Sequence, residues 1–237
     1  MANLAQSTTG FERRVPGARG RIGIIQPAPG IMLEHEWPRW IPDDILFPVA
    51  RVRMTSPDAE GYAQMADDAP AAAHDLATAG VDLVAYACTL GSLFAGSEAE
   101  NALIANLQRA SGKAAISLAA TSVLALRAVG AGRIAIMTPY ADAQNQWVAD
   151  YAVAAGFEVA GFIPAPLDIR TVGSMPPAEV AEVAARGLAQ LPEADALWIP
   201  CTAIQTMDMI ASLESITNLP VVSGTQALLW QDRKSVV

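Results

Sequence analysis

Cysteine and histidine are scarce in this sequence, whose 237 residues include only two of each. Two cysteines are too few for the disulfide framework of a small secreted protein. There is no Cys-x-x-Cys pair, and His35 and His74 show no metal-ligand spacing with Cys88 or Cys201. We therefore expect neither a structural disulfide nor a metal site. Two interpretations of the thiols stay open, because a free cysteine is either an inert apolar side chain or a functional group.

Positive charge and long apolar runs are also lacking. Lys and Arg number 15 against 24 Asp and Glu, so the net charge is −9 and neither nucleic acid nor an anionic membrane is an expected partner. No apolar run approaches a membrane span, and residues 1–10 lack the apolar core of a secretion signal. We expect a cytoplasmic protein. With 52% hydrophobic and 16% charged residues, the composition is that of a well-packed globular domain.

Apolar runs alternate with amphipathic or Ala-rich segments along the chain. The runs predict strands at 21–26, 46–54, 81–88, 114–119, 132–140, 157–162, 194–201 and 221–223. The intervening segments predict helices at 58–79, 97–110, 142–155, 178–190 and 203–214, one capped by Thr121 or Ser122, and one from 226 onward. The alternation of strand and helix favours parallel sheets.

Two parts of the sequence repeat. Residues 20–27 (GRIGIIQP) match 132–139 (GRIAIMTP), and Cys88-Thr89 matches Cys201-Thr202, at offsets of 112 and 113 residues. A looser match pairs 120–122 with 224–226. We therefore predict an α/β fold of two pseudo-twofold-related, flavodoxin-like (Rossmann-like) halves with mainly parallel four-stranded sheets. One half comprises residues 20–119 plus 222–237 and the other residues 120–221.

Each Cys-Thr pair ends a predicted buried strand, which is where ligands bind in open α/β sheets. A cleft between the halves would then carry Cys88 on one wall and Cys201 on the other. A thiolate at a strand-to-helix turn is favoured by backbone N–H groups and the helix dipole, so we expect lowered thiol pKa values. The same N–H groups and the hydroxyls of Thr89 and Thr202 are suited to hold a carboxylate.

Two thiols on opposite faces of one carbon permit two reactions. One thiolate removes an α-proton while the other thiol returns a proton from the opposite side, which inverts a stereocentre. Alternatively, a thiolate adds to a double bond, the bond rotates, and elimination gives the other geometric isomer. Neither route needs a metal or cofactor. A different class of function, a protein that binds a small acid in the cleft without reaction, would have no use for two opposed thiols.

Several of these features together resemble the aspartate/glutamate racemase superfamily: the two Cys-Thr pairs, Pro27 after the first strand, Thr138-Pro139-Tyr140 and the internal repeat. Within it, the sequence is most similar to maleate cis–trans isomerases and their relatives, which include arylmalonate decarboxylases. Residues 33–37, 41–42 and 50–52 fit the isomerase branch, and the resemblance spans about residues 20 to 231.

The resemblance implies roles for individual residues. Cys88 is the nucleophile or first base, and Cys201 is the opposing acid or base. Thr89, Thr202 and the Tyr140 hydroxyl bind carboxylate oxygens of the substrate.

The resemblance also bears on the substrate and the reaction. Pro27 shapes the pocket wall, and Gly30 contacts the substrate where maleate isomerases carry a carboxylate-binding Asn. The pocket is therefore expected to be more apolar there and to accept an apolar group. Arylmalonate decarboxylases keep only the second cysteine, with Gly at the first position, so both thiols favour isomerisation or racemisation over decarboxylation. The family further implies a small carboxylate substrate, no cofactor and a homo-oligomer.

Overall fold

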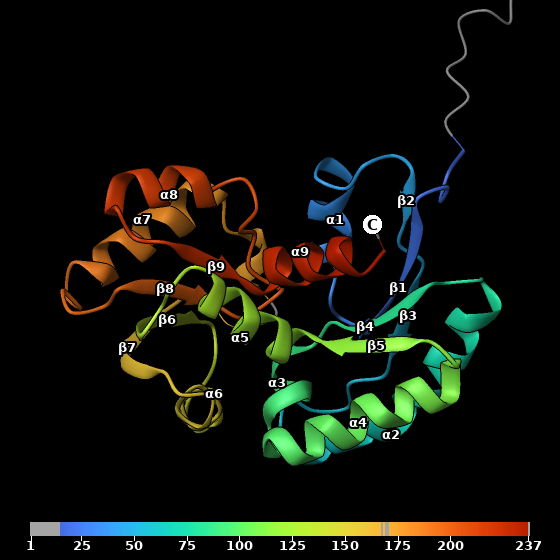
Figure 1. The fold of residues 1–237 in the computed structure, drawn as a ribbon. Coiled ribbons are helices and arrows are strands. Elements are labelled where there is room, and N and C mark those ends of the chain that lie inside the picture. Colours follow the sequence, from blue (N-terminus) through green and yellow to red (C-terminus); the bar gives the residue numbers. More distant parts are fainter. Residues whose placement is uncertain (1–14, 167, 169–170, 237) are drawn as a thin grey trace, which may run out of the picture.

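The computed structural model describes residues 15–166, 168 and 171–236, and it contains two parallel sheets. In the first, the order is β2-β1-β4-β5, and β3 also pairs with β1. In the second, the order is β7-β6-β8-β9. The predicted α/β fold with parallel sheets is confirmed (Figure 1). The strands are β1 (Gly20–Pro27), β2 (Ile45–Leu46), β3 (Val49–Val52), β4 (Leu83–Tyr86), β5 (Ala114–Ser117), β6 (Arg133–Thr138), β7 (Glu158–Pro164), β8 (Ala196–Ile199) and β9 (Val221–Ser223).

The two sheets repeat one pattern of strand order. In each, the strand that begins the repeated sequence (β1 or β6) lies between an edge strand and the strand that leads to a cysteine (β4 or β8). The offset found in the sequence therefore marks equivalent strands. One predicted strand, 46–54, is instead two short pieces, β2 and β3. Pro48 lies between them, and proline has no N–H for the ladder.

Helices cover both faces of the first sheet, because alternate residues of its strands are apolar on both sides. Ile25, Val84 and Tyr86 pack with residues of α2 and α4 on one face. Ile24 and Ala85 pack with residues of α1 and α9 on the other. The helices are α1 (Met32–Glu36), α2 (Ala59–Thr78), α3 (Thr89–Leu93), α4 (Gly96–Ser111), α5 (Leu118–Ala128), α6 (Asp142–Ala154), α7 (Pro177–Leu188), α8 (Ile210–Thr217), α9 (Gly224–Val236) and the 3₁₀ turns η1 (Trp37–Arg39) and η2 (Val172–Ser174).

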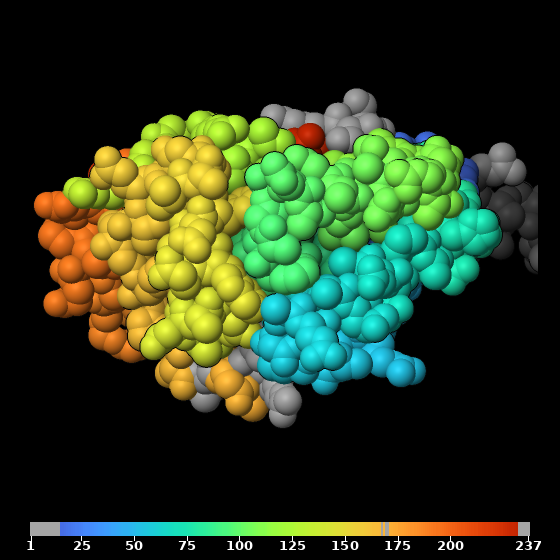
Figure 2. Space-filling view, turned by 90° about the horizontal axis from the view of Figure 1, so that it is seen from below, coloured from blue at the N-terminus to red at the C-terminus, as the bar shows by residue number. Residues whose placement is uncertain are grey.

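The two sheets are joined by helix contacts on opposite sides. On one side α5 packs along α9. On the other, α6 lies against α3 and α4, and the Trp147 ring of α6 meets the Phe94 ring at 6.4 Å between centroids. Figure 2 shows this second face, where the yellow side chains around α6 lie directly against the green side chains of the first half. The buried Glu100 carboxylate spans the contact, because it accepts hydrogen bonds from Ser117 and from Tyr151 Oη (2.6 Å).

Two predicted helix starts are wrong. The helix expected to be capped by Thr121 or Ser122 begins at Leu118, and Ser117 caps it by accepting from the Ala120 N–H at 3.1 Å. The hydroxyls of Thr121 and Ser122 instead donate to the Leu118 carbonyl inside the helix.

The segment after Cys201 also differs from the predicted helix 203–214. Residues 201–209 form irregular turns, and α8 begins only at Ile210. The predicted limits of the halves, after 119 and after 221, fall inside α5 and inside β9. The division of the chain into halves therefore stays a prediction. Among the described residues no helix is long and apolar enough to cross a membrane.

Candidate active site

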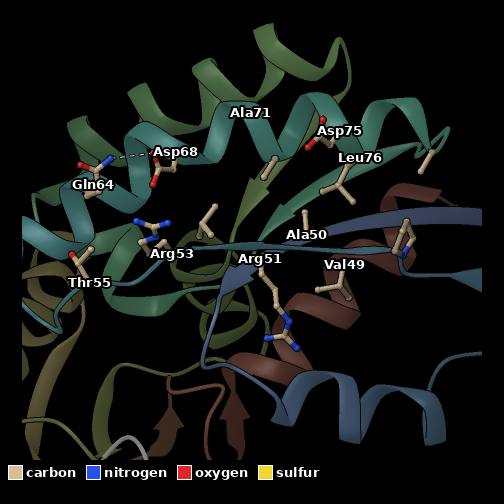
Figure 3. A pocket seen from close by; sticks show the side chains of 14 residues that line it. Val49, Ala50, Arg51, Arg53, Thr55, Gln64, Asp68, Ala71, Asp75 and Leu76 are labelled. Carbon is tan, nitrogen blue, oxygen red and sulfur yellow. Dashed lines mark hydrogen bonds between the residues drawn. The ribbon is translucent and has the colours of Figure 1, made fainter.

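A pocket of about 590 Å³ lies at the carboxyl ends of the strands of both sheets. All seven residues predicted for the site line it, from both halves of the chain. Its walls are formed by Pro27, Ala28, Pro29, Gly30, Met54, Thr55, Ser56, Pro57, Tyr62, Cys88, Thr89, Leu90, Tyr140, Cys201, Thr202 and Ala203. A larger and more open hollow of about 980 Å³ lies between β3 and α2 (Figure 3), but it contains neither thiol. We therefore take the two-thiol pocket as the candidate site.

Cys88 sits between β4 and α3, and the backbone there folds as the sequence predicts. It is the extended N-cap residue of α3, and its sulfur accepts a hydrogen bond from the Gly91 N–H at 3.3 Å. Gly91 must be glycine for packing reasons. A Cβ there would lie 2.7 Å from the Tyr86 hydroxyl oxygen and 3.1 Å from the Cys88 sulfur, closer than packed atoms tolerate.

Cys201 also lines the pocket, two residues beyond β8. Its sulfur is surrounded by three hydrogen-bond donors: the Tyr140 hydroxyl and the backbone N–H groups of Ala203 and Ile204. Cys88 and Cys201 are both free and buried. The fold thus brings both thiols, one after β4 and one after β8, to the lining of one pocket.

The pKa values of both thiols are raised, whereas the sequence predicts that they are lowered. Burial raises the pKa of Cys88 to about 12, although the Gly91 N–H opposes the change. Burial also raises the pKa of Cys201, against the three donors around its sulfur. A charge on Cys201 raises the pKa of Cys88 further, so the two thiols compete for one negative charge. The donors that the sequence predicts are present, but desolvation outweighs them.

The predicted carboxylate-binding hydroxyls lie in different surroundings. Thr89 Oγ1 donates to the Pro200 carbonyl at 2.5 Å, a bond that ties the two halves together beside the thiols. The Tyr140 hydroxyl contacts both Cys201 and Thr89 by hydrogen bonds. The Thr202 hydroxyl makes no side-chain hydrogen bond to a described residue, so it is free to meet a ligand. Carboxylate binding by these hydroxyls stays a prediction.

Sequence reasoning missed Tyr62, which α2 carries into the pocket. Its side chain is buried. Burial, followed by the charges of Cys88 and then Cys201, raises its pKa well above the usual range, and the side chain lines the pocket together with both thiols. In the sequence, Tyr62 is an aromatic residue in the first turn of an Ala-rich helix, which is typical of a core position. Only the folded chain shows that this side chain lines the same pocket as Cys88.

The loop 27–30 forms the pocket wall after β1, and Arg51 holds its shape. Arg51 Nη1 donates to the carbonyls of Ala28 (2.8 Å) and Gly30 (2.6 Å). Its Nη2 pairs with Glu34, which also accepts from Gln26 Nε2 at 2.6 Å. Figure 3 shows the Arg51 side chain pointing away from α2. Arg51 therefore stabilises this wall of the pocket through its backbone carbonyls, and its own side chain does not line the pocket.

None of the described residues that line the pocket is an acid, a lysine, an arginine or a histidine. A bound carboxylate would be held by hydroxyls and backbone N–H groups, which are effective donors in a dry site. The part of the chain that the structure describes also contains no group of three or more His, Cys, Asp or Glu side chains that could hold a metal ion.

Two parallel sheets of like strand order, with two free thiols lining one pocket, fit the aspartate/glutamate racemase superfamily, to which the relatives below also point. The family model of arylmalonate decarboxylase matches residues 22–236, so the chain belongs to that family.

The individual relatives are of two kinds, maleate isomerases and an arylmalonate decarboxylase. The maleate isomerase of Geobacillus stearothermophilus is 28% identical over 231 residues, 91% of either chain. The arylmalonate decarboxylase of Bordetella bronchiseptica is 24% identical, over 88% of this chain and 87% of that one. Among solved structures, a cysteine-to-serine mutant of the Nocardia farcinica maleate cis-trans isomerase, with a covalently bound succinylcysteine intermediate, matches with a TM-score of 0.82. It is 26% identical over 91% of this chain and 92% of that one.

Proposed function

We propose that the protein is a cofactor-independent isomerase that acts on a small carboxylic acid through Cys88 and Cys201. The observation that carries the proposal is the pair of buried free thiols, one from each half, that line one pocket. An inert cysteine packs as a small apolar residue and needs no donors. Here each sulfur faces backbone N–H groups and the common pocket, which is the arrangement of a nucleophile and an opposing acid.

For an unsaturated substrate, the Cys88 thiolate adds to one carbon of the double bond. A carbon–sulfur bond forms, and the π electrons move onto the neighbouring carbon and its carboxylate. The former double bond then rotates as a single bond. Expulsion of the sulfur returns the electrons and leaves the other geometric isomer. The succinylcysteine intermediate in the Nocardia relative supports this covalent route.

For a saturated substrate, Cys88 takes the α-proton and the Cys201 thiol gives its proton to the opposite face. The two sulfurs then hold the reverse protonation, ready for the return reaction. In either route, negative charge grows on the carboxylate oxygens. The Thr202 hydroxyl and the nearby backbone N–H groups are donors that stabilise it, and the Tyr140 hydroxyl joins them when its single proton turns from the Cys201 sulfur to the substrate.

Decarboxylation of a malonate is the second candidate, because the matching family model is that of arylmalonate decarboxylase. The apolar wall of Pro27, Ala28, Pro29 and Gly30 suits a substrate with an apolar substituent. The presence of both thiols favours isomerisation, since a decarboxylase needs only one proton donor to the product carbanion. We further propose that the protein works in the cytoplasm, where two free thiols stay reduced, and that it forms a homo-oligomer.

Proton NMR in D₂O with a panel of small acids tests the function. The panel is maleate, aspartate, glutamate, methylmalonate and phenylmalonate. We expect either conversion of maleate to fumarate or exchange of an α-proton for deuterium without change in the carbon skeleton. Loss of CO₂ from a malonate would place the protein with the decarboxylases. Binding without reaction across the panel would favour a sensor of small acids.

A further inference from the structure

The two thiols differ in the donors around their sulfur atoms. Cys201 has three: the Tyr140 hydroxyl and the N–H groups of Ala203 and Ile204. Among the described residues Cys88 accepts one hydrogen bond, from the Gly91 N–H at 3.3 Å. The shared negative charge therefore rests more easily on Cys201. The proposed function, on which this inference rests, needs Cys88 to carry that charge when it attacks the substrate.

Tyr86 lies at the end of β4, two residues before Cys88, and is fully buried. Its hydroxyl has no hydrogen-bond partner among the described residues. An unpaired buried hydroxyl costs stability, and phenylalanine would fill the same space without that cost. Nothing in the resting fold requires a hydroxyl on residue 86. A hydrogen-bond partner that is present only in another state of the site would explain it.

The candidate for that partner is the Cys88 sulfur. The Tyr86 hydroxyl oxygen and the Cys88 sulfur lie 2.7 Å and 3.1 Å from the point where a Cβ of Gly91 would stand. Both atoms thus border one small space, which exists because residue 91 has no side chain. Their separation cannot exceed the sum of these two distances, and rotation of the thiol about its Cα–Cβ bond changes it further.

We propose that Tyr86 is a positioning residue for Cys88, whose hydroxyl donates a hydrogen bond to the sulfur when the sulfur is a thiolate. No covalent bond changes, and the proton stays on the tyrosine. A charge-assisted hydrogen bond is the stronger kind, so it shifts the shared charge from Cys201 toward Cys88. Each thiol then accepts a hydrogen bond from its own tyrosine, Cys88 from Tyr86 and Cys201 from Tyr140.

Other titratable groups near Cys88 do not supply this donor. Tyr62 faces it from α2, and Cys201 faces it from the turns after β8. Asp58, the N-cap of α2, acts on Tyr62. A charge on Cys201 opposes a thiolate at Cys88, and Tyr62 interacts with both thiols, more with Cys88 than with Cys201. Tyr86 is the one whose pKa responds to a charge on Cys88 and not to one on Cys201, and its buried hydroxyl has no hydrogen-bond partner among the described residues.

Thiol alkylation tests the proposal without a substrate, because the chain has only two cysteines. Cys201→Ala leaves Cys88 as the sole thiol, and Cys88→Ala leaves Cys201. Tyr86→Phe and its matched control Tyr140→Phe are made in each background. The rate of iodoacetamide alkylation is followed by mass spectrometry from about pH 6 to pH 10.

We expect Tyr86→Phe to slow alkylation of Cys88 about tenfold at a fixed pH, the effect of raising its pKa by about one unit, and to change Cys201 less than about twofold. Tyr140→Phe should do the reverse. Urea unfolding should find Tyr86→Phe at least as stable as its parent, so that slower alkylation is not loss of the fold.

Two results would overturn the proposal: an unchanged rate at Cys88 in Tyr86→Phe, or equal slowing of both thiols. Since the assay contains no substrate acid, its outcome is separate from the proposed function. A protein that turns over none of the acids, yet shows the selective tyrosine effect, would refute the function alone. A working isomerase without that effect would refute the role of Tyr86 alone.

Discussion

The carboxylate of Glu36 offers a quantitative test of how the two halves are joined. It is buried on α1, and its Oε1 accepts from the N–H groups of Thr206 (2.5 Å) and Met207 (2.7 Å), in the turns that follow Cys201. Glu36→Ala leaves both donors without a partner. A buried unsatisfied donor costs about 1–3 kcal/mol, so the variant should lose about 2–6 kcal/mol of unfolding free energy. For a chain of this length each kcal/mol lowers the Tm by roughly 2–4 °C.

Glu36→Gln is the matched control, because its amide oxygen can still accept both N–H groups. Burial raises the pKa of Glu36 above its usual value, with Asp208 adding to the increase and Arg39 opposing it. A raised folded-state pKa contributes stability that is fully present below the unfolded-state pKa and is lost as the pH rises through the folded-state pKa. The Gln variant should therefore equal the wild type at acid pH and be at least as stable at neutral pH.

Urea unfolding followed by circular dichroism, at several pH values, measures all three proteins. Two outcomes would refute the reasoning. One is a Glu36→Ala variant within about 0.5 kcal/mol of the wild type, the range of an ordinary surface change. The other is a Gln variant as unstable as the Ala variant, which would mean that the accepted hydrogen bonds are not what stabilises the turns.

Two further substitutions test the walls of the pocket. Gly91→Ala places a Cβ against Tyr86 and Cys88, and overpacking of this kind costs about 1–3 kcal/mol. Urea unfolding should show the lost stability, and the rate of Cys88 alkylation should change. Wild-type values in both assays would contradict the packing argument. Arg51→Lys replaces a two-pronged guanidinium, which bridges the loop carbonyls and Glu34, by a point charge. We expect KM to rise at least about threefold with less than about 1 kcal/mol lost in stability, since the pair is partly exposed; an unchanged KM would show that the loop keeps its shape without the arginine.

The strand pattern of this fold could be predicted from the sequence because it depends on local signals. Apolar runs and the repeat at 20–27 and 132–139 marked equivalent strands, and the Cys-Thr pairs marked the pocket end of each sheet. All seven predicted site residues line one pocket. The family relationship inferred from the same residues is confirmed by the matching family model.

What the sequence could not supply are features set by contacts between distant residues. Residues 201–209 do not form the predicted helix start, and Glu36, from the other half, accepts the N–H groups of Thr206 and Met207. The direction of the thiol pKa shifts depends on burial, which no local pattern reports. Tyr62 and Tyr86 have the pattern of core residues, and only the folded chain brings both hydroxyls toward the thiols.

The central claim is that both thiols take part in one reaction. The most direct measurement is turnover by Cys88→Ala and Cys201→Ala, with an acid that the wild-type protein converts and with circular dichroism to confirm the fold. Acid–base or nucleophilic partners of this kind contribute factors of about 10²–10⁴. We predict that each variant loses at least about a hundredfold in kcat while its spectrum stays unchanged. Full activity in either variant would contradict the two-thiol mechanism.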